Sequence, residues 1–154
     1  MGRYGAVVEW SLESGDFSAG RYSRAHQWTF DGGVSVPASS SPTIVPLPHS
    51  REDAVDPEEA FVAALSSCHM LFFLSLAAAE GIVVDRYRDA ASGVLARSDD
   101  GALRMTRVTL RPEASYRPGH EPTPEQLTRL HHEAHTQCFI ANSVTSEVVT
   151  EIVS

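Results

Sequence analysis

The chain contains two cysteines, Cys68 and Cys138, and these residues are the best suited to covalent chemistry. Intracellular thiols that pair with each other are usually redox-active, because the cytoplasm keeps structural disulfides reduced. A free cysteine can also be a small hydrophobic residue that is buried and inert. The count alone therefore leaves two interpretations open, a redox pair and a pair of inert core residues.

A reactive Cys68 needs a positive charge or several hydrogen-bond donors nearby, because burial raises the pKa of a thiol and only the thiolate attacks. Residues 60–79 around it include no charged side chain. The cation must therefore come from elsewhere, and Arg21 and Arg24 in the predicted strand 21–30 are the candidates. Arginine suits this task because it stays protonated and its planar group can donate to several acceptors at once.

Such an arginine needs a carboxylate to hold it, and Glu58 and Glu59 are the candidates. Ten residues separate Glu58 from Cys68, which is roughly 15 Å along a helix. If both belong to one site, they come from antiparallel partners in a dimer or from a broken helix. The composite site and the homodimer are thus one prediction.

Two histidines together with Cys138 allow a rival interpretation as a metal site. His131, His135 and Cys138 follow the i, i+4, i+7 spacing that places ligands on one face of a helix. This spacing is only weakly specific in a chain with 7 histidines. We expect structural histidines here, and we expect His69 beside the thiol to pack or to support the site residues rather than to act as a base.

Composition excludes several classes of function. The net charge is −8, from 20 acidic and 12 basic residues, which argues against nucleic acid as a partner. The sequence has no G-x-S-x-G elbow of a serine hydrolase and no Gly-rich phosphate loop, so we expect no nucleotide or other cofactor. Its start reaches polar residues too early for a signal peptide, which favours the cytoplasm.

The predicted elements indicate an α+β fold in a single domain over residues 1–154. Strands are expected at 4–12 and 21–30, followed by a Pro-rich connection at 37–50. A long helix should begin after Asp56 and end at Gly81. The remaining elements are a hairpin of strands 83–98 and 102–116, a helix capped by Thr123 and a strand at 143–153. This order lacks βαβ alternation, so the sheet should be antiparallel.

The long helix should lie at the centre of a homodimer. It is apolar on all sides over roughly 35 Å, and one small sheet cannot cover it, so a second copy is the natural cover. A membrane span is the alternative, but Ser66, Ser67 and His69 in an otherwise soluble sequence argue against it. We expect these hydroxyls to bond back to the preceding helical turn.

The segments DPEEAFVAALSSCHMLFFLSLA (56–77) and CFIANSV (138–144) resemble those of the OsmC-like family, which includes the organic hydroperoxide resistance proteins. This resemblance implies antiparallel sheets packed around long central helices in an intertwined homodimer. It also implies that Glu58 orients the active-site arginine. Arg24 matches this arginine best, by its distance to the Asp31-Gly32 turn, and Arg21 stays a possible alternative. Many members place proline where this chain has Phe139.

The resemblance further implies a thiol peroxidase with Cys68 as the peroxidatic and Cys138 as the resolving cysteine. Cys68 would attack an organic hydroperoxide to form a sulfenate, which condenses with Cys138 to a disulfide that a lipoyl-type dithiol reduces. The apolar residues Phe61, Leu65 and Phe72 would favour alkyl or fatty substrates. The alternative is a non-catalytic dimeric redox-sensing or ligand-binding protein on the same scaffold.

Overall fold

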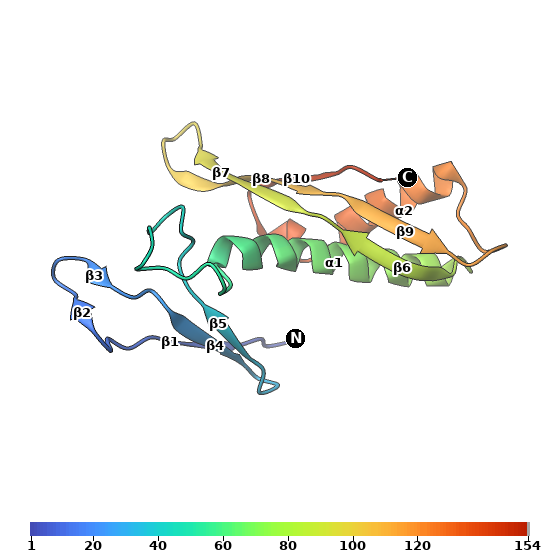
Figure 1. Ribbon diagram of the computed structural model, residues 1–154. Coiled ribbons are helices and arrows are strands. Elements are labelled where there is room, and N and C mark those ends of the chain that lie inside the picture. Colours follow the sequence, from blue (N-terminus) through green and yellow to red (C-terminus); the bar gives the residue numbers. More distant parts are fainter. Residues whose placement is uncertain (154) are drawn as a thin grey trace. The chain divides into compact units, whose positions relative to one another are not determined.

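The computed structural model describes residues 1–153, and the chain forms two compact units, Met1–Ala60 and Phe61–Ser154. Figure 1 shows the element order. The first unit contains β1 (Ala6–Glu9), β2 (Gly15–Asp16), β3 (Arg21–Tyr22), β4 (His26–Phe30), β5 (Ser35–Ala38) and the start of α1 (Pro57–Ala79). The second continues with β6 (Val84–Asp89), β7 (Ser92–Arg97), β8 (Leu103–Leu110), β9 (Pro112–Tyr116), α2 (Pro124–Gln137), the 3-10 helix η1 (Ala141–Ser143) and β10 (Glu147–Thr150). The α+β class predicted from the sequence is confirmed, whereas the single domain stays a prediction.

The first unit is built on an antiparallel sheet in the order β1-β4-β5. The two strands predicted at 4–12 and 21–30 do pair, with Val8 opposite Trp28. Between them the chain forms a small antiparallel ribbon of β2 and β3, because Gly15 and Gly20 both adopt positive φ and turn the backbone. The start of the Pro-rich connection belongs to β5, an edge strand that tolerates Pro37.

Helix α1 begins and ends as its sequence predicts. The Asp56 carboxylate accepts from Glu59 N–H at 2.7 Å, and the Glu59 carboxylate accepts from Asp56 N–H at 3.3 Å, which is a capping box. At the other end Gly81 has a φ of 75°, a conformation that favours glycine, and Ile82 N–H donates to the Ala77 carbonyl. The helix is continuous from Pro57 to Ala79.

The second unit contains two antiparallel strand pairings where the sequence analysis predicted a single hairpin. The predicted strands 83–98 and 102–116 each divide in two, so that β7 pairs with β8 and β6 pairs with β9. The tight turn at Asp99-Asp100-Gly101 is present between β7 and β8. The last strand, β10, pairs with β8 in parallel, which the expected all-antiparallel sheet did not include.

Two hydrophobic clusters form the core of the second unit. Phe73 and Leu130 lie in one, where α1 meets α2, and Leu65 and Val108 lie in the other, where α1 meets β8. Close packing against β7 requires Gly93, because a Cβ there would lie 2.7 Å from the Val62 side chain. These contacts fix α1 to the elements that carry the second cysteine.

Only part of α1 is covered. Its fully buried residues, Leu65, His69, Phe73 and Ala77, recur every four positions and form one stripe, while Leu71 on another side is 61% exposed.

Ser66 does not bond back to its own helix as expected. It donates instead to Asp89 at 2.6 Å, and the same carboxylate accepts from Arg111 N–H at 2.6 Å. The aspartate offers a charged acceptor, which is stronger than a helix carbonyl.

By length and composition α1 could cross a membrane, a criterion that core helices of soluble proteins also meet. Leu65 and Phe73 pack in the two core clusters, so we assign α1 as a core helix.

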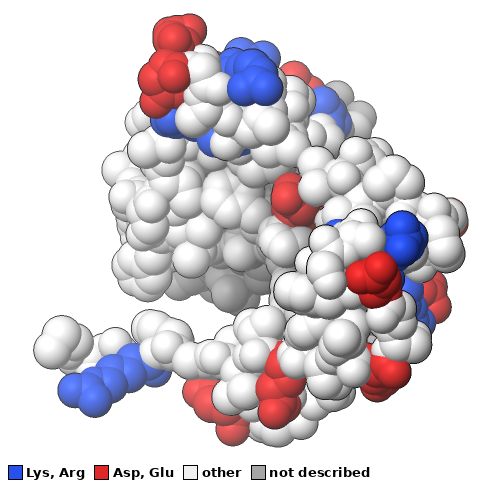
Figure 2. Space-filling view, turned by 90° about the vertical axis from the view of Figure 1, so that its left-hand side faces the viewer, with Lys and Arg blue, Asp and Glu red and all other residues white. Residues whose placement is uncertain are grey.

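On the face that Figure 2 shows, basic side chains mostly lie beside acidic ones and form no large basic patch.

Candidate active site

The two cysteines come together in the second unit. Cys68 is half-buried in the middle of α1, and Cys138 is buried at the C-terminal cap of α2. The backbone of Cys138 has left the helical conformation, with N–H still donating to the His135 carbonyl at 3.2 Å. Its sulfur accepts from Ala141 N–H at 3.3 Å, at the start of η1. The end of α2 thus holds the second thiol in a fixed turn.

The environment of Cys138 keeps it protonated. Burial and, next, a side-chain hydrogen bond with Cys68 raise the pKa of the Cys138 thiol to about 11. The backbone donor at Ala141 opposes this rise but does not outweigh it. At neutral pH Cys138 is therefore a thiol with Cys68 as a near neighbour, which favours a redox pair over two separate inert core residues.

Arg24 lies in the first unit, between β3 and β4. Its Nη1 donates to the carbonyls of Gly20, at 2.9 Å, and Tyr22, at 2.5 Å. The guanidinium carbon lies 3.7 Å from the centre of the Tyr22 ring, a cation–π contact. Within residues 1–153 its Nε and Nη2 make no hydrogen bond, so these donors can bind a ligand or a residue of a second copy.

Arg24 and Glu58 line the same cavity of about 510 Å³ in the first unit. No ion pair joins them among the described residues, so the expected orienting role of Glu58 stays a proposal. The competing candidate Arg21 instead pairs with Asp16 at 2.9 Å, and two-thirds of its side chain is exposed. Placement therefore favours Arg24 over Arg21.

Three aromatic side chains, Trp10, Phe17 and Tyr22, also line this cavity. Phe17 stacks on Tyr22 with ring centres 4.7 Å apart, and Trp10 contacts both at 5.9 and 5.5 Å. The Phe17 side chain is 55% exposed. Sequence reasoning missed this cluster, because its members lie on β3 and in the connections around β2 without a shared period. Exposed rings beside an arginine form a surface for an organic molecule or a partner chain.

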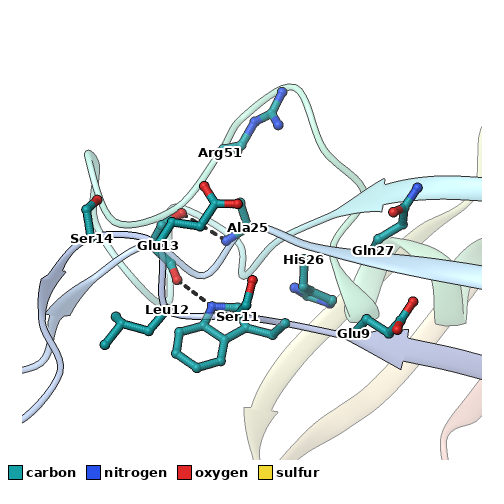
Figure 3. Close-up of a pocket in the computed structure, with 11 residues that line it drawn as sticks. Glu9, Ser11, Leu12, Glu13, Ser14, Ala25, His26, Gln27 and Arg51 are labelled. Carbon is teal, nitrogen blue, oxygen red and sulfur yellow. Dashed lines mark hydrogen bonds between the residues drawn. The ribbon is translucent and has the colours of Figure 1, made fainter.

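A second cavity of about 520 Å³ lies in the same unit, and Figure 3 shows it in close-up. Glu9, Glu13 and Arg51 bring charged groups to its wall. Arg51 forms an ion pair with Asp53: its Nε and Nη2 donate to the two carboxylate oxygens at 2.9 and 2.7 Å. His26 lines both this cavity and the one that contains Arg24.

One histidine of α2, His131, forms a buried pair with His69 of α1. His69 Nε2 and His131 Nδ1 lie 2.9 Å apart, and the His131 ring stacks on Phe73 with centres 4.3 Å apart. Burial, together with the neighbouring imidazoles, lowers the pKa of both histidines to about 4, so they are neutral at pH 7. Among residues 1–153 no three His, Cys, Asp or Glu side chains are arranged to hold a metal ion. His69 packs, as the sequence suggested.

The structure places two residues near the cysteines, Leu65 and Phe139, that the sequence analysis had singled out. Leu65 is 1% exposed and belongs to a core cluster, so it is not available to a substrate. Phe139, which stands where many OsmC-like proteins have proline, is 71% exposed and meets Phe72 edge to face at 5.0 Å. With Phe139 at this position the backbone still closes a turn after α2, in which Asn142 N–H donates to the Cys138 carbonyl at 3.0 Å.

The family model for OsmC-like protein matches residues 50–153. Among solved structures, an OsmC-like protein of unknown function from Vibrio cholerae is 52% identical over 99% of this chain and 100% of its own, with a TM-score of 0.97. An organic hydroperoxide resistance protein from Elizabethkingia anophelis and OhrB of Bacillus subtilis, also an organic hydroperoxide resistance protein, are each 18% identical with a TM-score of 0.71. They cover 99% and 98% of this chain and 94% and 98% of their own. None of the curated proteins compared with the chain matches it.

Proposed function

Because the chain belongs to the OsmC-like protein family, we propose that it is a thiol peroxidase that reduces organic hydroperoxides to alcohols. The observation that carries the proposal is that Cys68 and Cys138 lie near each other in the second unit, close enough for Cys68 to raise the pKa of the Cys138 thiol, with Cys68 half-buried and Cys138 buried. A peroxidase of this class needs one accessible thiol to react and a second within reach to resolve the product.

In the first step the Cys68 thiolate attacks the distal oxygen of the hydroperoxide. A sulfur–oxygen bond forms, the oxygen–oxygen bond breaks, and the alkoxide leaves and takes up a proton as the alcohol. Sulfur is oxidised to the sulfenic acid and the peroxide is reduced. Cys68 suits this step better than Cys138, because it is the less buried of the two and the pKa of Cys138 is raised to about 11.

In the second step the Cys138 sulfur attacks the Cys68 sulfenic acid. A disulfide forms and water leaves, carrying the sulfenic oxygen and the thiol proton. The raised pKa of Cys138 keeps it protonated until the sulfenic acid appears, so it does not compete for the peroxide. A small dithiol of the lipoyl type then reduces the disulfide by exchange, which regenerates both thiols.

Arg24 would stabilise the reacting oxygens, and Glu58 would hold Arg24. Both line one cavity, and the unpaired Nε and Nη2 of Arg24 are the donors that the negative charge on the leaving oxygen needs. Because α1 is continuous, Glu58 and the Cys68 of the same chain stay roughly 15 Å apart along its axis. The complete site therefore needs Arg24 and Glu58 from one copy and Cys68 from another.

The proposed assembly is a homodimer, with a helix surface that still needs a partner. The side of α1 away from the buried stripe includes Leu71 and the small residues Ala64, Ser67 and Ala78, all exposed. Small residues let two helices approach closely, and the exposed apolar surface gains from burial. A soluble dimer in the cytoplasm, without membrane or nucleic-acid partners, fits the charge and the family.

A peroxidase assay with Cys68→Ser tests the proposal. The wild-type protein with a dithiol reductant should release one alcohol for each hydroperoxide consumed, and Cys68→Ser should show no turnover. Cys138→Ser is the matched control. In the absence of reductant this variant keeps the first step only, so it should yield one alcohol per chain and then stop. Full turnover by Cys68→Ser would overturn the proposal.

A further inference from the structure

Among residues 1–153 no strand pairs with the backbone at Arg24. Residues 23–25 lie between β3 and β4, outside any ladder. Individual groups hold them instead. The Trp10 indole donates to the Ser23 carbonyl at 2.8 Å, and Arg24 N–H donates to the His49 carbonyl at 2.8 Å. The direction of the Arg24 side chain thus depends on bonds that other residues supply.

His26 supplies the remaining bond, to the Arg24 carbonyl. Its Nδ1 lies 2.7 Å from that oxygen, and its Nε2 lies 3.0 Å from Trp28 Nε1. An indole N–H can only donate, so Nε2 is the acceptor and has no proton. The proton of the neutral ring is then on Nδ1, which donates to the Arg24 carbonyl. The two neighbours fix the tautomer of His26 and use both of its nitrogens.

His26 stands between the two cavities of the first unit. It begins β4, it is half-buried, and it lines both cavities, whereas Arg24 lines the one that it shares with Glu58. Figure 3 shows its ring projecting from the strand beside Ala25 and Gln27. On the other side of Arg24, the Gly20 and Tyr22 carbonyls hold Nη1 of the guanidinium. The backbone and one end of the side chain are therefore both anchored.

We propose that His26 is a positioning residue for Arg24. The chain from Trp28 through the neutral His26 ring to the Arg24 carbonyl fixes the backbone at Arg24, so that the two unpaired donors of the guanidinium face the cavity in one orientation. The proposal rests on the proposed function in one respect, that Arg24 is the arginine of the peroxidatic site. It adds a residue that neither the sequence motifs nor the cysteines indicate.

The first test measures the ring nitrogens of His26 by NMR in uniformly ¹⁵N-labelled protein at pH 7. The expected result is a protonated Nδ1 and an unprotonated Nε2, and in Trp28→Phe the tautomer should no longer be fixed. The opposite tautomer or an imidazolium in the wild-type protein would overturn the proposal. This measurement needs no enzymatic activity.

The second test is a double-mutant cycle on kcat/KM for cumene hydroperoxide. His26→Leu should lower kcat/KM about tenfold, the effect of one lost hydrogen bond on a transition state. In an Arg24→Met background the same change should have no further effect, because His26 acts only through Arg24. His26→Asn, whose amide N–H replaces Nδ1–H, should recover most of the activity.

Equal losses from His26→Leu in both backgrounds would mean a general structural role and would overturn the proposal. Circular dichroism of His26→Asn and His26→Leu checks that both variants are folded. If the wild-type protein shows no turnover at all, the proposed function fails and with it the catalytic part of this proposal. The NMR measurement decides the His26–Arg24 bond in either case.

Discussion

Glu58 and Cys68 lie on one unbroken helix, α1, at opposite ends of a segment roughly 15 Å long. Neither side chain can reach across that length to meet the other within one chain. Of the two arrangements that the sequence left open, a broken helix and a site shared between two copies, the continuous α1 removes the first. The shared site is the one that we carry into the predictions.

Complementation between two inactive variants tests the shared site. Cys68→Ser and Glu58→Gln should each lack turnover as homodimers. After unfolding and refolding as an equal mixture, heterodimers contain one site with both Cys68 and Glu58, so activity should return to about a quarter of wild type. Peroxide consumption measures this return. A mixture that stays inactive, although mass spectrometry shows heterodimers, would place both residues of each site in one chain.

Arg24 and Arg21 provide a matched pair of substitutions. Arg24→Ala should lower kcat/KM at least a hundredfold, because two charge-assisted donors to the reacting oxygens are lost. Arg21→Ala removes only an exposed pair with Asp16, so activity should stay within about twofold and stability within about 0.5 kcal/mol. Steady-state kinetics with cumene hydroperoxide decide between them. A larger loss in Arg21→Ala would reassign the arginine.

The buried His69–His131 pair should make the protein acid-sensitive. Burial lowers the pKa of both to about 4 in the folded chain, whereas an unfolded histidine titrates near 6.5. Between these values the unfolded state binds more protons, so the free energy of unfolding should fall as the pH drops from about 6.5 to 4. The expected loss is of the order of 3 kcal/mol for one histidine, at about 1.4 kcal/mol per pKa unit.

Urea denaturation at pH 7 and pH 5 measures part of this loss, about 2 kcal/mol for one histidine, because pH 5 still lies above the folded pKa. The double variant His69→Leu with His131→Leu removes the pair and should flatten the pH dependence. His132→Gln is the control, because His132 is an exposed neighbour on α2 and its loss should leave the slope unchanged. A wild-type slope equal to that of the double variant would contradict the assignment of neutral, buried histidines.

The helices were the most predictable part of the fold. Asp56 with Glu59 and Thr123 with Gln126 are capping boxes in the sequence and in the structure, because a cap depends on residues within one turn. The strands were less predictable. The segment 83–98, predicted as one strand, divides near residue 90 into β6 and β7. The division arises because β6 pairs with β9 and β7 pairs with β8, and these partner strands lie further along the chain.

The candidate site was likewise predictable in part. The types and spacing of Glu58, Cys68 and Cys138 stand out in the sequence, and the structure brings the two thiols together. Sequence could not reveal the aromatic wall around Arg24, nor the role of His26. A histidine acquires its tautomer from the donors around it, here Trp28 two residues away on the same strand, and only geometry shows that bond.

The most direct test of the thiol peroxidase is to treat the reduced protein with one equivalent of cumene hydroperoxide and map both cysteines by mass spectrometry, with the alcohol measured in parallel. We predict a rapid disulfide between Cys68 and Cys138 within one chain and one alcohol released per disulfide. Two unmodified thiols after prolonged exposure would contradict the peroxidase and favour a non-catalytic ligand-binding protein on the same scaffold.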